Sequence, residues 1–161
     1  MDSEFTRRVS IDHVHELVHE GRLFFVSDVR TTGSPVVYWI SIGSECAHIA
    51  FDFETSLKVG LQIIEGVTIT GAGTPLLTQS YNREHNVGCS VIISYGPTYT
   101  GGAIFRVNQS GFGTNAGSAR SGSSRASAEY IFKPNTQYIL MATPSGTADI
   151  RVIADFYEGR D

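Results

Sequence analysis

The sequence predicts an all-β fold, an antiparallel β-sandwich of jelly-roll type with about eight to ten strands. Short runs of alternating apolar and polar residues recur along most of the chain, and Gly, Pro and Asn separate them. Tyr and Phe, which favour sheets, are abundant at 7 and 9 residues. With 161 residues, the chain is long enough to form one domain with a substantial core.

The chain opens with a His-rich segment. Residues 1–21 are expected to form an N-terminal arm or strand, because their polar and apolar side chains alternate. The one possible helix, residues 11–20, is short and crowded with His. Residues 22–161 are then expected to form the single sandwich domain, in which no internal boundary is visible.

Nine strands are expected in this domain. Six precede the final third of the chain, at residues 23–29, 35–42, 47–53, 57–65, 87–95 and 103–109. Three more alternating runs lie in residues 129–158, where two turns centred on Pro134 and Pro144 separate them. The last run places four apolar side chains on one face, namely Ile150, Val152, Ala154 and Phe156.

A segment rich in Gly and Ser interrupts the strand pattern at residues 108–127. It contains Arg120 and Arg125 but no acidic residue. Such a composition cannot bury apolar surface, so a flexible loop is expected. Two interpretations remain open, a solvated surface loop and an arm that becomes ordered against an acidic partner surface.

One pattern resembles a catalytic motif. His15 and His19 bracket an H-E-x-x-H sequence, which on a helix can bind zinc and activate water. Gly21 would end such a helix almost at once, and the residues before it alternate as in a strand. We therefore expect a polar arm or strand at an interface, with a zinc hydrolase as a distant alternative. No catalytic residue, metal or cofactor is predicted.

Bulk properties exclude several partners. A net charge of −4 gives no reason to expect nucleic acid, and no segment reaches the roughly 20 apolar residues that span a membrane. The first residues lack the apolar stretch of a secretory signal. Cys46 and Cys89 are expected to be free, buried thiols. These features indicate a protein made and used without export.

In their order along the chain, several short elements resemble the head decoration, or cement, proteins of tailed bacteriophages. The most distinctive is the block at residues 129–138. The others are His19-Glu20-Gly21, Tyr38-Trp39, Ile64-Glu65-Gly66, Gly71-Ala72-Gly73-Thr74-Pro75-Leu76, Tyr81-Asn82-Arg83, Pro97-Thr98 with Gly101-Gly102, and Asp155-Phe156-Tyr157-Glu158.

This resemblance implies a structural protein of the virion rather than an enzyme. It implies binding to the outside of the assembled shell of major capsid protein, after assembly in the bacterial cytoplasm, and a homo-oligomer, a dimer or trimer. The alternative is an adhesive or carbohydrate-binding sandwich on the virion surface. Contacts with capsid or a second subunit are expected in the N-terminal segment and the Gly/Ser-rich loop, at Arg7, Arg8, His13, His15, His19, Phe112, Arg120 and Arg125.

Overall fold

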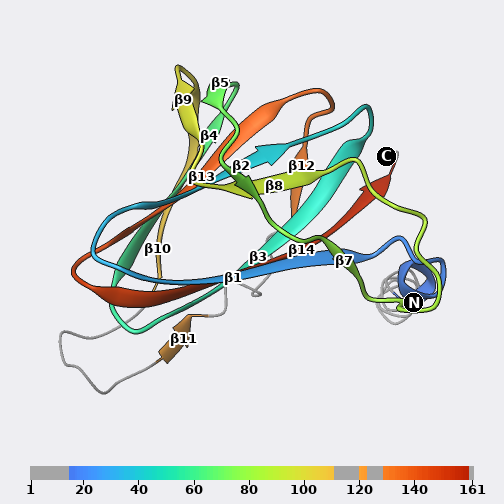
Figure 1. The fold of residues 1–161 in the computed structure, drawn as a ribbon, viewed down its shortest axis with the longest axis horizontal. Coiled ribbons are helices and arrows are strands. Elements are labelled where there is room, and N and C mark those ends of the chain that lie inside the picture. Colours follow the sequence, from blue (N-terminus) through green and yellow to red (C-terminus); the bar gives the residue numbers. More distant parts are fainter. Residues whose placement is uncertain (1–14, 111–119, 123–128, 160–161) are drawn as a thin grey trace, which may run out of the picture.

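Two antiparallel sheets pack face to face in the structure, a computed structural model that describes residues 15–110, 120–122 and 129–159 (Figure 1). This part of the chain contains one helical turn, residues 15–19, and fourteen strands. The strands are β1 (Phe24–Thr32), β2 (Val36–Ser41), β3 (Cys46–Thr55), β4 (Val59–Glu65), β5 (Thr68–Gly71), β6 (Thr74–Pro75), β7 (Gln79–Ser80), β8 (Ile92–Tyr95), β9 (Thr98–Thr100), β10 (Ala103–Ser110), β11 (Arg120–Gly122), β12 (Tyr130–Phe132), β13 (Gln137–Pro144) and β14 (Ala148–Gly159).

The strand order is that of a jelly roll, which confirms the predicted fold class. Sheet A has the order β11-β3-β14-β1-β7, with β12 also paired to β3, and sheet B has the order β10-β4-β13-β2-β8-β6. Eight strands form the two four-stranded halves of the roll, β12-β3-β14-β1 and β10-β4-β13-β2. The total exceeds the expected eight to ten because very short strands extend the edges and form a separate β5–β9 ribbon.

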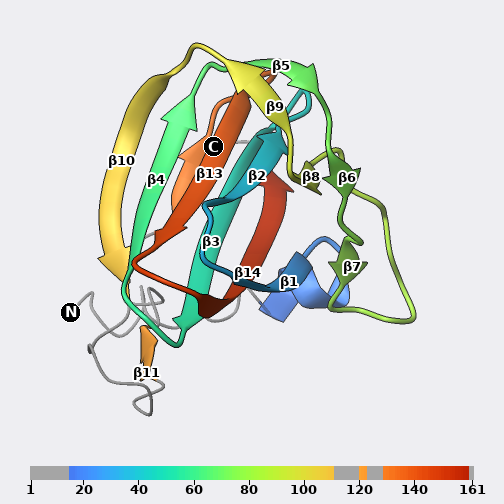
Figure 2. The same ribbon diagram turned by 60° about the vertical axis from the view of Figure 1, so that its left-hand side comes forward.

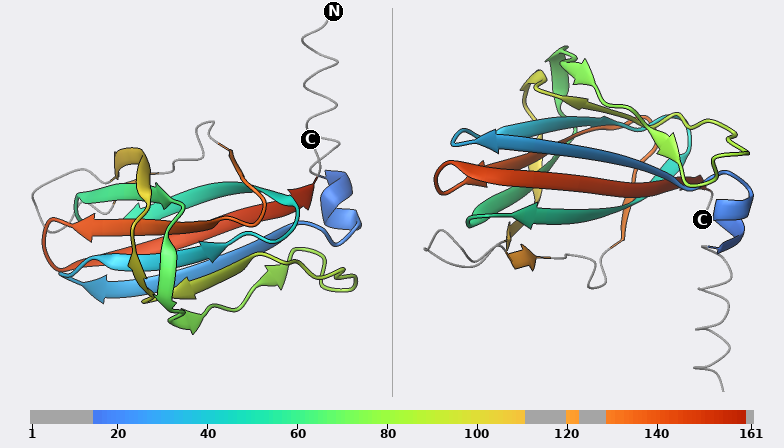
Figure 3. Two further views of the ribbon diagram at one scale, coloured as in Figure 1. Left: turned by 90° about the horizontal axis from the view of Figure 1, so that it is seen from above. Right: turned by 60° about the horizontal axis from the view of Figure 1, so that its bottom comes forward.

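Strand β14 lies in the middle of sheet A. It pairs with β3 from Ile150 to Gly159 and with β1 from Ala148 to Phe156. Its alternating apolar residues are all buried towards sheet B, as the sequence predicts. The right-hand view of Figure 3 shows β14, in red, running between β1, in blue, and β3, in teal.

The core between the sheets is rich in aromatic rings. Phe132 and Tyr138 stack at a centroid distance of 4.2 Å, and both are almost completely buried. The Tyr138 hydroxyl accepts a hydrogen bond of 3.0 Å from the Lys133 backbone N–H, so its polar end is satisfied. The turn between them uses Asn135 at a positive φ of 52°, a conformation that Asn tolerates better than most residues.

A polar cluster also joins the two sheets. Asp28 of β1 accepts hydrogen bonds from Arg30 Nε at 2.7 Å and from the Tyr38 hydroxyl at 3.0 Å. The Arg30 guanidinium lies 3.8 Å from the ring centroid of Tyr95, on sheet B. Burial and the adjacent carboxylate raise the pKa of Tyr38, so its hydroxyl stays protonated and remains a donor.

Two expectations from the sequence are wrong in this structure. Residues 15–19 form a helical turn rather than a strand, and Leu17 packs into the domain with 2% of its surface exposed. The strand expected at residues 87–95 starts only at Ile92, because the residues before it form an exposed connection. Residues 1–14 and most of the predicted loop, 111–119 and 123–128, lie outside the described residues.

Truncation of Phe156 should test the central role of β14. The side chain is fully buried and stacks on Phe24 at 5.9 Å, so Phe156→Ala should lower the free energy of unfolding by about 3 to 5 kcal/mol. Val29→Ala is the control, because Val29 exposes 59% of its surface on the outer face of the same sheet. Its cost should stay below about 1 kcal/mol in urea denaturation. Equal losses would contradict this account.

Candidate binding surfaces

Sheet B is apolar on its outer face as well as on the face that lines the core. Backbone pairing aligns one row of apolar side chains across four strands, Ile104, Ile64, Ile139 and Trp39. The next row on this face contains Val107, Gln62, Met141 and Val37. Sheets with one solvated face usually alternate apolar and polar residues, so this outer face needs a cover.

The β5–β9 ribbon provides that cover over the middle of the sheet. Ile69 of β5 and Tyr99 of β9 pack against Ile64 and Ile139, and these form a second hydrophobic cluster with Val67. Figure 2 shows the ribbon at the upper end of sheet B, so it covers one end of the middle strands. Glycine is needed at position 102, next to the ribbon, since φ there is 90° and a Cβ would lie 2.6 Å from Val67.

The ribbon does not cover the edge of sheet B that β10 forms. Strand β10 pairs with β4 on one side only, and no described strand pairs with its other side. Its side chains from Ala103 to Val107 are exposed, with Ile104 at 58%, Phe105 at 49% and Val107 at 62%. We call Ile104, Phe105 and Val107 the β10 apolar edge. Such an edge exposes both apolar surface and backbone hydrogen-bonding groups, which makes it a site for protein contact.

A bulge shapes this edge. Pairing with β4 shifts between Ile104 and Arg106, so Phe105 is left without a partner in the register. Its ring meets the edge of the Tyr130 ring from sheet A at a centroid distance of 6.1 Å. The bulge thus brings the open edges of the two sheets together. As a result, this surface contains residues from both sheets.

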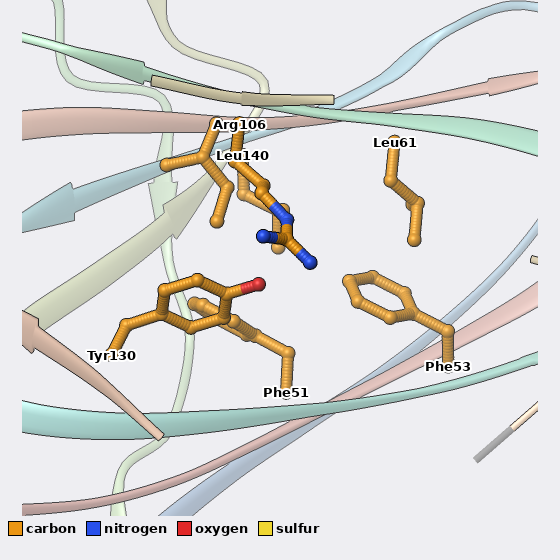
Figure 4. Close-up of a pocket in the computed structure, with 7 residues that line it drawn as sticks. Phe51, Phe53, Leu61, Arg106, Tyr130 and Leu140 are labelled. Carbon is orange, nitrogen blue, oxygen red and sulfur yellow. The ribbon is translucent and has the colours of Figure 1, made fainter. Parts of the chain in front are cut away.

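A small gap opens between the sheets beside this edge. Figure 4 shows Arg106 pointing into it from β10, towards Tyr130, Phe51 and Phe53. The cavity volume is about 30 Å³, whereas small-molecule sites typically measure several hundred Å³. This gap can hold one or two waters but no substrate.

The helical turn at residues 15–19, just before β1, forms a second candidate surface. Its end has the Schellman pattern, in which the Arg22 N–H bonds the Leu17 carbonyl at 2.9 Å and the Gly21 N–H bonds the Val18 carbonyl at 3.0 Å. Gly21 takes a φ of 68°. The Asn82 side-chain amide also donates to the His19 carbonyl at 3.0 Å. These contacts fix a turn that would be too short to form alone.

Two imidazoles meet on the exposed side of this turn. The Nε2 atoms of His15 and His19 lie 2.9 Å apart, and the ring centroids lie 4.5 Å apart. The H-E-x-x-H spacing therefore does place both rings on one helical face, while the strand alternation that argued against it does not occur. Arg22 and Glu20 form an exposed ion pair of 3.3 Å next to the turn.

The described residues do not complete a hydrolytic zinc centre. Within residues 15–110, 120–122 and 129–159, no group of three or more His, Cys, Asp or Glu side chains is placed to hold a metal ion. In the same ranges, no helix is long and apolar enough to cross a membrane. The predicted absence of enzymatic activity stays a prediction.

Of the two cysteines, Cys89 differs from a reactive thiol. Both Cys46 and Cys89 are free and half-buried. Cys46 begins β3, whereas Cys89 lies in the connection before β8. Burial, with a further effect from the Glu158 carboxylate, raises the pKa of Cys89 to about 11. Because the thiolate is the nucleophile, Cys89 is unsuited to attack a substrate near neutral pH.

The structure describes only part of the predicted contact set. His15 and His19 come together on the helical turn, and for Arg120 only the backbone pairing of β11 with Thr55 is described. The remaining residues lie outside the described part of the chain, namely Arg7, Arg8, His13, Phe112 and Arg125. The β10 apolar edge was missed, although its run of Ala103, Ile104, Phe105, Arg106 and Val107 contains three large apolar residues in close succession.

Comparison with known proteins leaves the family open. No family model matches the chain, and no curated protein or solved structure matches it either. The fold therefore rests on the strand order itself, and the resemblance to phage decoration proteins rests on the sequence elements that carry it.

Substitution of Gly21 should disrupt the helical turn. A Cβ at position 21 would lie 2.2 Å from the His85 carbonyl oxygen, in addition to the strain of a positive φ. We expect Gly21→Ala to cost about 2 to 4 kcal/mol and to raise hydrogen exchange in the turn. Gly66→Ala is the matched control, since Gly66 has a φ of 72° but nothing within 4 Å of the added Cβ.

The control should show the backbone strain alone, about 1 kcal/mol. Urea denaturation gives the free energies, and amide exchange locates the change. Equal costs for the two substitutions would mean that contact between the turn and the His85 segment contributes nothing.

Proposed function

We propose that this protein is a capsid decoration protein, a structural component that binds the outer surface of an assembled shell and bridges neighbouring capsomers. The observation that carries the proposal is the β10 apolar edge, on a strand that pairs on one side only among the described strands and exposes three large apolar side chains. Exposed surface of this kind on a rigid sandwich favours attachment to another protein over catalysis.

The properties of the edge fit a protein partner. An extended partner segment can add to β10 through backbone hydrogen bonds, while Ile104 and Val107 contribute apolar contact on the outer face of sheet B. The cavity beside the edge is too small for a substrate, and Cys89 is not activated. Many copies on a symmetric shell would turn one modest contact into stable decoration.

The sequence resemblance is what supports a capsid protein as the partner. The order of short elements along nearly the whole chain resembles decoration proteins, and the block at residues 129–138 is the most distinctive among them. In the structure this block forms β12, the turn at Asn135 and the start of β13, next to the open edge of both sheets. The major capsid protein of a tailed phage is therefore the proposed partner, with a homo-oligomer on the capsid exterior.

The alternative is an adhesive or carbohydrate-binding domain on the virion. Trp39 and Tyr99 favour it, because both rings lie in the outer cluster of sheet B and are only partly buried. Aromatic rings of this kind can stack on sugars. However, the Trp39 indole N–H already donates to the Gln137 side-chain oxygen at 2.5 Å, so this donor is already used and would not bond a sugar hydroxyl.

A charge on the β10 apolar edge should weaken attachment. Val107→Glu places a carboxylate where apolar contact is proposed, so its apparent affinity for the shell should fall by tenfold or more, equivalent to about 1.4 kcal/mol. The measurement is co-sedimentation of the full-length protein with shells of the phage that encodes it. Val107 is exposed, so the thermal unfolding of this variant should be close to that of the unsubstituted protein.

Val29→Glu is the matched control, because it changes an equally exposed valine on sheet A. It should decorate shells normally. Equal loss in both variants would exclude the β10 apolar edge as the contact, and no binding of the unsubstituted protein to shells would reject the decoration role. Binding to a glycan array without affinity for shells would instead support the alternative.

A further inference from the structure

We propose that His15 and His19 together bind a divalent transition metal ion, Cu²⁺ or Ni²⁺, as a two-imidazole chelate. This site is independent of shell binding and of hydrolysis. It rests on the 2.9 Å separation of the two Nε2 atoms on an exposed helical face. Imidazole nitrogen is a preferred ligand for these metals, and both rings place their Nε2 atoms side by side on the exposed face of the turn.

Intrinsic affinity indicates which metal the pair prefers. Metal to imidazole bonds measure about 2.0 to 2.1 Å, so two adjacent ligands lie about 2.9 Å apart at a right angle and about 3.3 Å apart at a tetrahedral angle. The observed 2.9 Å is an ordinary hydrogen-bond length, and it brings the two nitrogens within chelating distance without selecting either angle. Affinity for nitrogen ligands is highest for Cu²⁺, and imidazole is also a good ligand for Ni²⁺.

The protein holds the two rings in place before metal arrives. Leu17, between them in the sequence, is buried in the domain, and the Schellman bonds at Gly21 fix the end of the turn. Asn82, in the connection after β7, donates a side-chain hydrogen bond to the His19 carbonyl. A chelate formed by two preorganised ligands loses less conformational entropy than one formed by two free side chains.

Binding requires a change of tautomer and a small rotation of the two rings. In the present pair one Nε2 carries the hydrogen and the other accepts it, so one ring must move its proton to Nδ1 before both Nε2 lone pairs face the metal. No net proton is released by this change when both rings are neutral. Among the described residues no third side chain completes the set, so water would take the remaining positions.

Titration of the untagged full-length protein with NiCl₂, followed by calorimetry, tests the site. We expect one ion per chain, and at least tenfold weaker binding in both His15→Gln and His19→Gln. His85→Gln is the matched control, since it removes another exposed imidazole and leaves the pair intact. Glu16→Gln tests the acidic residue of the motif, which takes no part in the chelate and should change affinity little.

Electron paramagnetic resonance of the Cu²⁺ complex should show coupling to two imidazole nitrogens, and to one in either pair variant. Coupling to one nitrogen in the unsubstituted protein would overturn the proposal. So would equal weakening in His85→Gln, or tighter binding of Zn²⁺ than of Cu²⁺. Circular dichroism melting of each variant confirms that a loss of binding is not a loss of fold.

Discussion

The pairing of β14 with β3 on one side and β1 on the other is the constraint on which the rest of the structure depends. Strand register has a period of two, so a slip of one residue would turn Phe156 and its apolar companions from the core to solvent. Once the register is fixed, the end of β14 places the N-terminal turn, because the Glu158 carbonyl accepts a hydrogen bond from Arg22 at 2.9 Å. Its carboxylate also accepts one from the Ser90 N–H at 2.9 Å. One strand thus sets the core and positions two distant segments.

Sheet B connects the fold to the proposed binding role, because it is apolar on both faces. The inner face is buried against sheet A, and the outer face needs a second cover, which the β5–β9 ribbon supplies through Ile69 and Tyr99. The strands of the ribbon are only a few residues long, and the ribbon leaves the side chains of Ile104 and Val107 on β10 uncovered. Ile104 and Val107 continue the same apolar rows into solvent. The exposed edge is thus a direct result of how far the cover extends, rather than a separate feature added to the fold.

Alternation made the strands and the jelly-roll class predictable, but not the face of every residue. Val36 to Ile40 is apolar throughout, so nothing in the sequence shows that Trp39 lies on the outer face, and a large aromatic residue in such a run is more often buried in the core. The helical turn at residues 15–19 depends on burial of Leu17 and on Asn82, more than sixty residues away. The β10 edge depends on which strands pair across β4. Each missed feature is thus decided by long-range contacts that local patterns do not encode.

The two candidate surfaces use separate parts of this framework. The helical turn is held by Arg22, Asn82 and the end of β14, whereas β10 is held by β4 and the bulge beside Tyr130. Figures 1 and 2 show the turn and β10 on opposite sides of the sandwich. Effects at separated sites that share no contacts are generally additive. A rigid sheet domain between them can therefore carry a metal-binding turn and a protein-binding edge without coupling one to the other, and each can be changed while the core between them keeps its register.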